Sequence, residues 1–412
     1  MKLLYFHQHF STPKGGTGTR SYEFAKELIA QGHQVTIVCG SFDVANTGLT
    51  GSFIHGRREG DVDGIHIVEF ELMYSNNQSF LTRSKQFMRF AMLCCREIKS
   101  ANPDLVFCTS TPLTIAFPGM YAKVIKRIPF VFEVRDLWPE LPKAMGVIKQ
   151  PIILWLLKLL EIAAYKSADK VIALSNGMAE GVANHVSYQN IVTISNGCDL
   201  YLSQCEDAGT ELPNLQEYFE QGSFFAVYAG THGLANGLDV LVDAAVQLKE
   251  MQFEHIKIVL VGDGMKKRSL IEQANALQLD NIIFLENMPK QALFSLYKKC
   301  DVGLMVLENI PAFYNGTSPN KFFDYLSARL PVICNYPGWI KAEIESTNIG
   351  LSVAPESPKE IAKALNKLSQ DKVLLSNMSR NCEQLAHDKF NRRNLAEKFI
   401  KTLEEVHSNA NK

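Results

Sequence analysis

The sequence predicts an α/β protein built from two domains, each with a doubly wound parallel sheet. Three observations predict this fold class. The chain has 412 residues, which exceeds a single hydrophobic core and favours two domains of roughly 200 residues. In both halves, short apolar runs that end in glycine or polar residues alternate with amphipathic helical stretches. A polar stretch at 202–222 separates the two series.

The first half opens with a strand at 2–6, a glycine-rich turn, a helix at 21–31 and a second strand at 34–38. This is the βαβ unit that starts many nucleotide-binding domains. A strand at 64–70 and a long helix at 81–100 follow, and further apolar strands are expected at 103–108, 129–134, 170–175 and 190–194. Strands of this kind are typical of a sheet buried on both faces.

The second half repeats the pattern, with strands expected at 224–229, 255–260, 281–285 and 302–307 and a helix from about Gly237 to Met251. The last helix is expected at about 391–407. The sequence therefore predicts an N-terminal domain at 1–202, a linker at 203–222, a C-terminal domain at 223–388, and a terminal helix at 389–412 that packs back toward the N-terminal domain. In such sheets ligands bind beyond the carboxyl ends of the strands, and two such domains are expected to face a cleft.

Composition excludes several classes of protein. The formal net charge of −1 argues against nucleic acid as a partner. Nine cysteines without a Cys-x-x-Cys pair argue for a reducing compartment and against a disulfide framework or structural zinc. No secretory leader and no apolar run of spanning length is apparent. These observations favour a cytoplasmic location, and no metal requirement is expected.

A phosphate-binding site is predicted between 317 and 326. Ser318 is placed as the N-cap of a helix and Pro319 at its first position, so that free amides and the positive end of the helix dipole point toward one spot. Lys321 lies beside that spot. Asp324 follows one turn later, where a carboxylate accepts hydrogen bonds from sugar hydroxyls. An ordinary capped helix with a solvated lysine remains the alternative.

The turn of Gly15, Gly16 and Thr17 is the second candidate for phosphate contact, because glycine lets the backbone approach a ligand closely. Its glycines are not spaced as Gly-x-Gly-x-x-Gly and no acidic residue ends the second strand, so a dinucleotide oxidoreductase is not favoured. The alternative is a plain strand-to-helix turn.

Candidates for substrate contact and proton transfer lie at other strand ends. Asp136 follows a predicted strand and is placed as a group that orients or deprotonates a substrate hydroxyl, although the neighbouring Arg135 is expected to lower its pKa. A structural Arg135–Asp136 ion pair is the alternative. His9 and His232 stand at loop positions expected to face the cleft, and a structural role is the alternative for both.

With these residues in view, the chain resembles the GT-B glycosyltransferases of family 4, the retaining group that uses nucleotide sugars. The resemblance runs through Asn196-Gly197, Ala229-Gly230, Gly262-Asp263-Gly264 and the 318–332 segment. Within the family, the 135–140 and 315–321 segments resemble the WbuB-like branch of O-antigen and capsule transferases. That branch implies a UDP-linked N-acetyl deoxyhexosamine, such as UDP-N-acetyl-L-fucosamine, as donor and an undecaprenyl diphosphate-linked saccharide as acceptor.

The resemblance assigns roles to individual residues. Asp136 and Lys321 are the expected catalytic residues, and His9 and Arg135 are the expected acceptor-binding residues. The expected donor-binding residues are Gly15, Gly16, Thr17, Gly230, Thr231, His232, Asn287, Met288, Gly316, Thr317, Ser318, Asn320 and Asp324.

The sequence departs from the family pattern in three places. The usual Glu-x7-Glu pair is represented by Gly316 and Asp324, so donor identity cannot be transferred from the family. The basic pair that commonly binds the diphosphate is replaced by His232 and Asn236, which leaves its charge to Lys321, helix N-termini and Lys266 or Lys267. The usual glycine at the helix exit is Arg329.

Residues 78–127 predict a membrane contact, because eight lysines and arginines there are interleaved with apolar side chains. Residues 150–166 are a second candidate contact. An anionic membrane surface is the expected partner, with peripheral attachment at the inner face of a bacterial plasma membrane. The alternative is a core helix with a solvated basic face.

Two other functions remain open at this stage. The missing carboxylate and basic pair are also compatible with a catalytically silent subunit that binds a sugar nucleotide. An epimerase of the same fold that acts on UDP-N-acetylglucosamine needs additional acid and base carboxylates that the sequence does not place.

Overall fold

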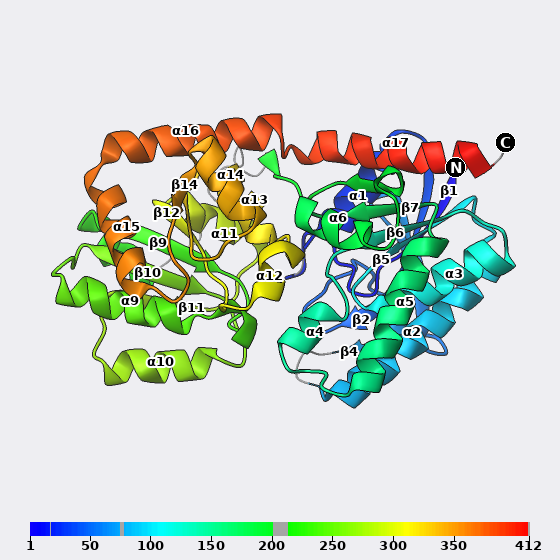
Figure 1. Ribbon diagram of the computed structural model, residues 1–412, viewed down its shortest axis with the longest axis horizontal. Coiled ribbons are helices and arrows are strands. Elements are labelled where there is room, and N and C mark those ends of the chain that lie inside the picture. Colours follow the sequence, from blue (N-terminus) through cyan, green and yellow to red (C-terminus); the bar gives the residue numbers. More distant parts are fainter. Residues whose placement is uncertain (17, 75–77, 201–212, 411–412) are drawn as a thin grey trace. The chain divides into compact units, whose positions relative to one another are not determined.

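The computed structural model describes residues 1–16, 18–74, 78–200 and 213–410, and divides the chain into two compact units. Unit 1 comprises Met1–Asn196, Asn315–Ser318 and Arg393–Lys412, and unit 2 comprises Gly197–Tyr314 and Pro319–Arg392. Both are layered α/β units (Figure 1). The predicted α/β class is confirmed. The predicted linker at 203–222 lies partly outside the described residues, and its described part contains helix α8 (Pro213–Glu220).

Unit 1 contains an eight-stranded sheet in the order β3-β4-β2-β1-β5-β6-β7-β8. The strands are β1 (Lys2–Phe6), β2 (Gln34–Phe42), β3 (Arg57–Val62), β4 (Ile65–Tyr74), β5 (Leu105–Thr109), β6 (Phe130–Val134), β7 (Lys170–Ala173) and β8 (Ile191–Thr193). The neighbouring pairs from β4 to β8 are parallel, but the edge strand β3 is antiparallel to β4. Strand β3 was not predicted, because its sequence is mostly polar or charged and shows no regular alternation of apolar and polar residues.

Helices cover both faces of this sheet. They are α1 (Arg20–Ala30), α2 (Phe80–Ala101), α3 (Ala116–Ile125), α4 (Glu140–Ala144), α5 (Pro151–Ser167), α6 (Asn176–Ala183) and α17 (Arg392–Ala410), with short 3-10 turns η1 (Leu113–Ile115) and η2 (Tyr188–Asn190). On β1, Leu4 and Phe6 belong to the core that α2, α3 and α5 cover, whereas Leu3 and Tyr5 belong to the core under α1 and α17. The two-residue period of the strand thus supplies both cores.

Unit 2 contains a six-stranded sheet in the order β11-β10-β9-β12-β13-β14, whose strand pairs are all parallel. The strands are β9 (Phe224–Ala229), β10 (Ile256–Val261), β11 (Ile282–Leu285), β12 (Val302–Met305), β13 (Val332–Cys334) and β14 (Gly350–Ser352). The helices, besides α8, are η3 (Leu234–Asn236), α9 (Asp239–Glu250), α10 (Lys267–Ala276), α11 (Lys290–Tyr297), α12 (Pro311–Gly316), α13 (Asn320–Ser327), α14 (Trp339–Thr347), α15 (Pro358–Gln370) and α16 (Lys372–Asp388).

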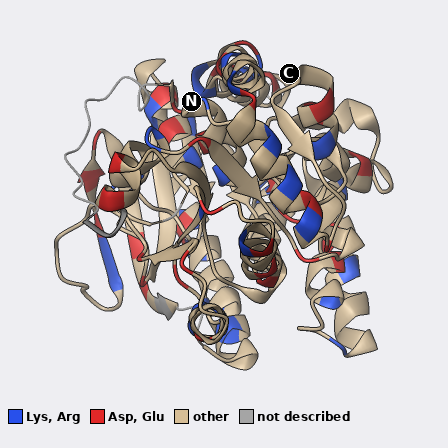
Figure 2. Ribbon diagram, turned by 90° about the vertical axis from the view of Figure 1, so that its left-hand side faces the viewer, with Lys and Arg blue, Asp and Glu red and all other residues tan. Residues whose placement is uncertain are grey.

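The same alternation builds two cores in unit 2. Phe225 and Val227 of β9 pack in the core that holds Phe322 and Phe323 of α13, and Ala226 and Tyr228 face the core under α9, α10 and α15. The central position of β9 in the sheet places the loop after it next to the N-terminus of α13. Basic and acidic residues both occur on the helices (Figure 2), in keeping with the small net charge.

The terminal helix α17 belongs to unit 1 from Arg393 onward. Its apolar face contributes Phe399, Ile400 and Leu403 to the core of unit 1, where the Phe399 ring lies 4.8 Å from that of Phe24. Unit 1 is therefore assembled from both ends of the chain.

Candidate active site

The loop after β9 and the first turn of α13 meet at Lys321. Gly230 follows β9 with a φ of +151°, and a Cβ atom added to it would lie 3.1 Å from the Lys321 Nζ. The same Nζ lies 3.7 Å from the ring centroid of Tyr228, near the end of the same strand. A residue larger than glycine at position 230 would crowd this ammonium group.

Lys321 is a desolvated cation. Burial lowers its pKa to about 7, and no carboxylate of the described residues forms a salt bridge with it. Among the described residues it lies over the face of the Tyr228 ring, which attracts a cation without neutralising it. An ammonium group in this setting gains substantially from a bound anion.

The N-terminus of α13 adds to the positive potential at this place, but its capping differs from the prediction. Pro319 is the N-cap, with φ −71° and ψ 130°, and no side chain caps the helix. Ser318 does not act as the N-cap: its hydroxyl is buried without a hydrogen bond, and its carbonyl accepts from the Asn196 amide at 2.8 Å in unit 1. Because the ψ of Pro319 is extended and not helical, the helix starts at Asn320 and not at the proline.

The predicted site segment is thus shared between the units. Gly316, Thr317 and Ser318 belong to unit 1, whereas Asn320, Lys321 and Asp324 belong to unit 2. In unit 1 the Ser175 hydroxyl donates to the Asn315 carbonyl at 3.3 Å, and a Cβ atom added to Gly177 would lie 2.6 Å from that oxygen. The sequence pattern did not indicate this division.

Asp324 lies on the same helix and faces Lys290, whose Nζ is 3.2 Å from the Asp324 Oδ1. Burial raises the pKa of Asp324, and the neighbouring ammonium of Lys290 opposes that rise. Sequence reasoning missed Lys290, although its place directly after the loop of β11 was a usable signal.

His232 lies in the loop after β9 and is fully buried. Burial, followed by the charge of Lys267, lowers its pKa to about 4, so the ring is neutral at pH 7. Its backbone amide donates to the Asp263 carbonyl at 2.8 Å, and Gly264 leaves no room for a Cβ atom beside the His232 carbonyl. The glycines after β10 therefore serve to pack this loop.

The remaining predicted donor residues of unit 2 lie at neighbouring strand ends. The Thr231 carbonyl accepts from the Tyr228 hydroxyl at 3.1 Å and from the Asn236 amide at 2.8 Å. Asn287 is exposed and Met288 is half-buried after β11. A role in framing a base stays a prediction for both.

Two lysines considered as additional phosphate ligands are already paired. Lys266 contacts Asp239 at 3.0 Å, and Lys267 contacts Glu286 at 2.7 Å. Lys321 differs from both, since no acidic partner competes for its charge. Arg329, at the exit of α13, has a φ of +61° and pairs with Glu383 at 3.1 Å, so an arginine occupies a left-handed position that favours glycine.

In unit 1, Asp136 follows β6 and its Oδ2 accepts a hydrogen bond from the Thr111 hydroxyl at 2.6 Å. The alternative, a structural Arg135–Asp136 ion pair, is not formed, since Arg135 is directed to His7. The expected fall in pKa was also wrong: burial raises the pKa of Asp136, and this effect exceeds the opposing effects of Thr111 and Arg135. A buried carboxyl group with a raised pKa is better suited to proton transfer than the sequence indicated.

Arg135 instead donates to the Nε2 of His7, at 3.2 Å from its Nη1. His7 lies 2.9 Å from the Ser21 hydroxyl through its Nδ1, and Ser21 also accepts from Tyr5 at 2.8 Å. Burial and then Arg135 lower the pKa of His7 well below its usual range, so the ring is neutral. Sequence reasoning selected His9 and missed His7, two residues earlier in the same loop.

His9 packs in an aromatic cluster, with ring centroids 4.6 Å from Tyr74 and 5.1 Å from Phe42. Burial and then Arg135 lower its pKa to about 4. It is only partly buried, so one part of the ring remains accessible.

The glycine-rich turn of unit 1 is held by its own hydrogen bonds. The Gly15 amide donates to the Thr12 carbonyl at 3.1 Å, and the Gly16 amide donates to the Val44 carbonyl at 2.9 Å. A Cβ atom on Gly15 would lie 2.1 Å from the Ser11 hydroxyl oxygen, so close packing alone requires glycine there. The predicted phosphate contact through these amides gains no support, and Thr17 lies outside the described residues.

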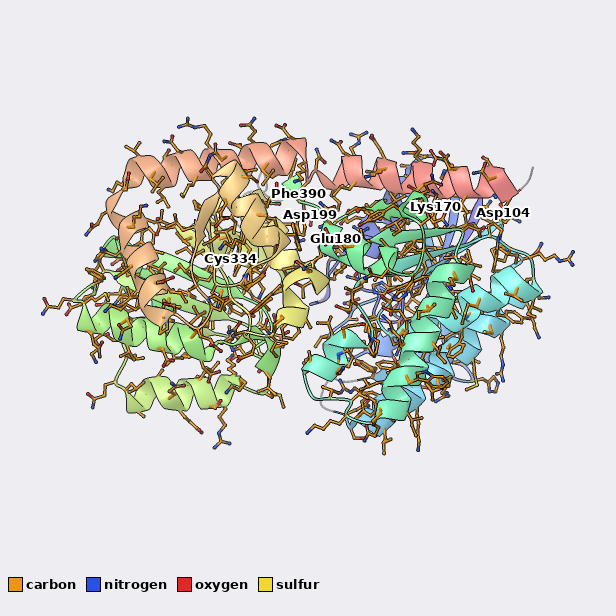
Figure 3. All side chains as sticks on the ribbon, viewed as in Figure 1. Asp104, Lys170, Glu180, Asp199, Cys334 and Phe390 are labelled. Atoms are coloured by element: carbon orange, nitrogen blue, oxygen red, sulfur yellow. The ribbon has the colours of Figure 1, made fainter. Side chains whose placement is uncertain are left out.

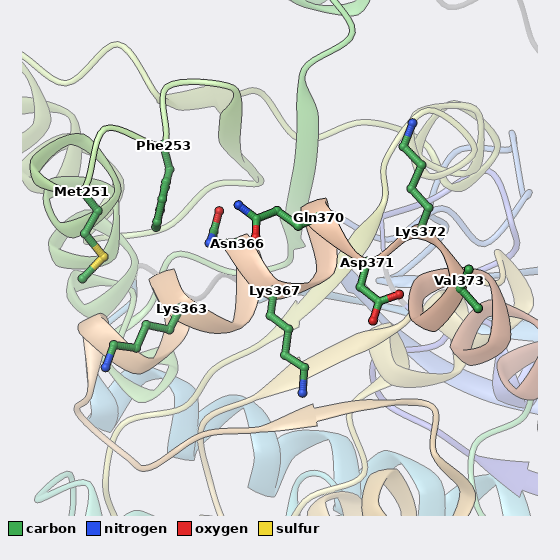
Figure 4. A pocket seen from close by; sticks show the side chains of 9 residues that line it. All are labelled: Met251, Phe253, Lys363, Asn366, Lys367, Gln370, Asp371, Lys372 and Val373. Atoms are coloured by element: carbon green, nitrogen blue, oxygen red, sulfur yellow. The ribbon is translucent and has the colours of Figure 1, made fainter.

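A hollow of about 770 Å³ lies elsewhere in unit 2, against α15 and the end of α9 (Figure 4). Its lining includes Lys363, Lys367 and Lys372 but no residue of the candidate site. Within the described part of the chain, no group of three or more His, Cys, Asp or Glu side chains could hold a metal ion.

None of the helices among the described residues is long and apolar enough to cross a membrane.

Comparisons with known proteins show which families the two halves of the chain match. Residues 14–202 match the family model described as Glycosyltransferase Family 4, and residues 215–385 match that described as Glycosyl transferases group 1. The Escherichia coli (strain K12) protein WcaI, provisionally described as a colanic acid biosynthesis glycosyl transferase, is 20% identical over 98% of this chain and 100% of its own length.

Two solved structures share the fold. An Escherichia coli structure titled as trehalose-6-phosphate bound with UDP-2-fluoro glucose has a TM-score of 0.73 and 13% identity, over 98% of this chain and 99% of its own. Anabaena Alr3699/HepE in complex with UDP and glucose has a TM-score of 0.68 and 17% identity, over 98% and 99%.

The fold and the two family matches define the class: this chain is a glycosyltransferase with the GT-B fold. Unit 1 carries the Family 4 match and unit 2 the group 1 match.

Proposed function

We propose that this protein transfers a sugar from a UDP-sugar, with retention of configuration, to a lipid-linked glycan. The proposed sugar is an N-acetyl deoxyhexosamine, as in the WbuB-like branch, and the proposed pathway is the synthesis of O-antigen, capsule or exopolysaccharide. The resemblance to that branch and the similarity to WcaI support the pathway. Structural relatives determined with UDP or a UDP-sugar support the nucleotide.

One observation carries the proposal: the desolvated ammonium of Lys321 lies beside Gly230 and the N-terminus of α13 without an acidic partner. Transfer from a UDP-sugar releases a diphosphate, whose growing charge must be met for the reaction to proceed. In the proposal Lys321 and the helix N-terminus meet that charge, no resident metal takes part, and Asp324 holds the ribose. Asp136 of unit 1 is the proposed group that orients or deprotonates the acceptor hydroxyl.

Nucleotide binding is tested first. Thermal shifts with UDP, GDP and ADP should be largest with UDP and should vanish in Lys321→Met, because a ligand that binds only the native state raises the melting temperature. Lys363→Met, which alters a lysine of the separate hollow, should keep the full shift. Equal loss in both variants, or no shift in the unaltered protein, would contradict the proposed site.

Turnover then separates transfer from binding alone. Incubation with a UDP-linked N-acetyl deoxyhexosamine and an undecaprenyl diphosphate-linked saccharide should extend the acceptor by one sugar, measured by mass spectrometry. Isomerised donor without acceptor would favour the epimerase. Binding without either product would favour the silent subunit.

An exposed apolar surface supports peripheral membrane attachment at the inner face of the plasma membrane. On α5, the solvent-facing residues Ile152, Trp155, Leu156 and Leu159 are 44–73% exposed and recur at helical spacing. The outer face of α2 presents Leu81, Met88 and Met92 together with Lys85, Arg89 and Arg96. Apolar side chains flanked by cations suit an anionic lipid surface.

Flotation with phosphatidylglycerol-containing vesicles tests this attachment. The double variant Trp155→Glu/Leu156→Glu should lose at least roughly tenfold in bound fraction, because each change places a carboxylate where the apolar contact forms. Val373→Glu on α16, where valine is 72% exposed, is the matched control and should float normally. Equal flotation of the two variants would count against the α5 surface.

A further inference from the structure

Two of the segments at which the chain crosses between the units lie side by side within unit 2. The chain passes from unit 1 to unit 2 after Asn196 and returns after Arg392. The Cys198 amide donates to the Phe390 carbonyl at 2.7 Å, and the Arg392 amide donates to the Cys198 carbonyl at 3.3 Å. Asp199 and Phe390 mark this place in Figure 3. These two connecting segments are therefore hydrogen-bonded to each other where they enter and leave unit 2.

Asp199 and Arg392 join these segments by a buried ion pair. The Arg392 Nε contacts one carboxylate oxygen of Asp199, and its Nη2 lies 3.2 Å from the other. Both residues are at least nine-tenths buried. Although burial opposes ionisation, Arg392 and Lys290 lower the pKa of Asp199 to about 2, so this carboxylate stays charged.

Lys290 extends the pair to the donor site. It begins α11, its Nζ contacts the Asp199 carboxylate, and the same Nζ lies 3.2 Å from the Asp324 Oδ1. Three elements therefore meet at one ammonium group: the connecting segment through Asp199, α11 through Lys290 and α13 through Asp324. Removing the ammonium would leave the buried Asp199 carboxylate and the half-buried Asp324 carboxylate without the cation that both contact, which disfavours the charged form of Asp324.

We infer that Lys290 is a positioning residue, which holds the Asp324 carboxylate charged and oriented toward the donor's ribose and ties it to the connecting segments through Asp199 and Arg392. This rests on the proposed function, since Asp324 must be the group that receives the ribose hydroxyls. Lys290 itself touches no reacting atom. Its effect on the donor is exerted wholly through Asp324.

Calorimetric titration with two ligands isolates that effect. UDP carries both ribose hydroxyls, whereas 2′,3′-dideoxyuridine diphosphate lacks them and has the same diphosphate. Lys290→Met should lower the affinity for UDP at least tenfold and change the affinity for the dideoxy ligand less than twofold. Lys290→Arg, which retains a cation, should recover most of the UDP affinity. Gln291→Met, at the next position of α11, is the matched control and should bind both ligands normally.

A double-variant cycle gives the second readout. In an Asp324→Asn background, Lys290→Met should cause no further loss of UDP affinity, because the carboxylate that it positions is gone. Three results would overturn the inference. Lys290→Met could weaken the binding of both ligands equally, or it could reduce UDP affinity just as much in the Asp324→Asn background. A folded Lys290→Met variant could also bind UDP with unchanged affinity. Failure of the unaltered protein to bind UDP would instead overturn the proposed function, and the inference with it.

Discussion

At the residue scale, the proposed donor site depends on one amino group, that of Lys321, whose pKa lies close to neutral pH. Tyr228 presents its ring face to Lys321, and Gly230 lets the ammonium approach the loop of β9. Burial lowers the Lys321 pKa to about 7, so its amino group is only partly protonated near neutral pH. A bound diphosphate favours the charged form and must raise that pKa.

UDP affinity should therefore fall with rising pH. Below about pH 7 the Lys321 ammonium is already present when UDP binds. Above that pH the amino group must take up a proton on binding, so UDP affinity should drop by up to roughly tenfold per pH unit between about 7.5 and 9. Titration calorimetry in buffers of different ionisation enthalpy measures the proton uptake directly. Lys321→Arg should bind UDP without proton uptake, because arginine keeps its charge. A flat pH profile in the unaltered protein would contradict this assignment.

At the element scale, Tyr325 fixes the position of α13 through hydrogen bonds to the backbone of β9. The Tyr325 hydroxyl accepts from the Ala229 amide at 3.2 Å and donates to the Val227 carbonyl at 3.1 Å, both on β9. Gly303 of β12 permits this, because a Cβ atom there would lie 2.5 Å from the Tyr325 ring. The distance between α13 and the loop after β9 thus depends on a glycine in a third element.

Gly303→Ala should weaken UDP binding as well as the fold. The added methyl group must displace Tyr325, and such overpacking typically costs about 1–3 kcal/mol of unfolding free energy. The shift of α13 should weaken UDP binding by roughly tenfold or more, since the Lys321 ammonium belongs to that helix. Denaturant unfolding and calorimetry measure the two effects. Gly51→Ala, where nothing lies within 4 Å, is the control and should leave both unchanged.

At the scale of the whole molecule, each unit has its own cores, but unit 1 is completed only by the end of the chain. Phe399 of α17 is fully buried, with its ring centroid 4.8 Å from Phe24 and 5.0 Å from Phe107. Unit 2 lies between these parts in the sequence. The core of unit 1 is therefore complete only when α17 is packed against it.

Phe399→Ala should destabilise unit 1 and leave donor binding intact. Loss of a buried phenylalanine typically costs about 3–5 kcal/mol. Scanning calorimetry should show one transition that UDP raises and another that the substitution lowers. Lys401→Ala, an exposed neighbour on α17, is the control and should shift neither. A substitution that lowers the UDP-sensitive transition equally would mean that the two units unfold together.

The sequence by itself determined the alternation of strands and helices, and with it the fold class, because a strand buried on both faces must be apolar along its length. It also determined that Lys321 and Asp324 share a helix that follows a polar loop. It did not predict β3, whose polar edge position lacks that apolar signature.

Only the tertiary structure decided which charges are paired. Lys266 and Lys267 resembled Lys321 in the sequence, yet both meet acidic residues and Lys321 does not. Lys290 and Asp199 are 91 residues apart, and His7 and Arg135 are 128 residues apart. Local sequence patterns indicate which residues form a helix or a strand. The pairing and desolvation of charged side chains depend on neighbours that come close only when distant segments fold together.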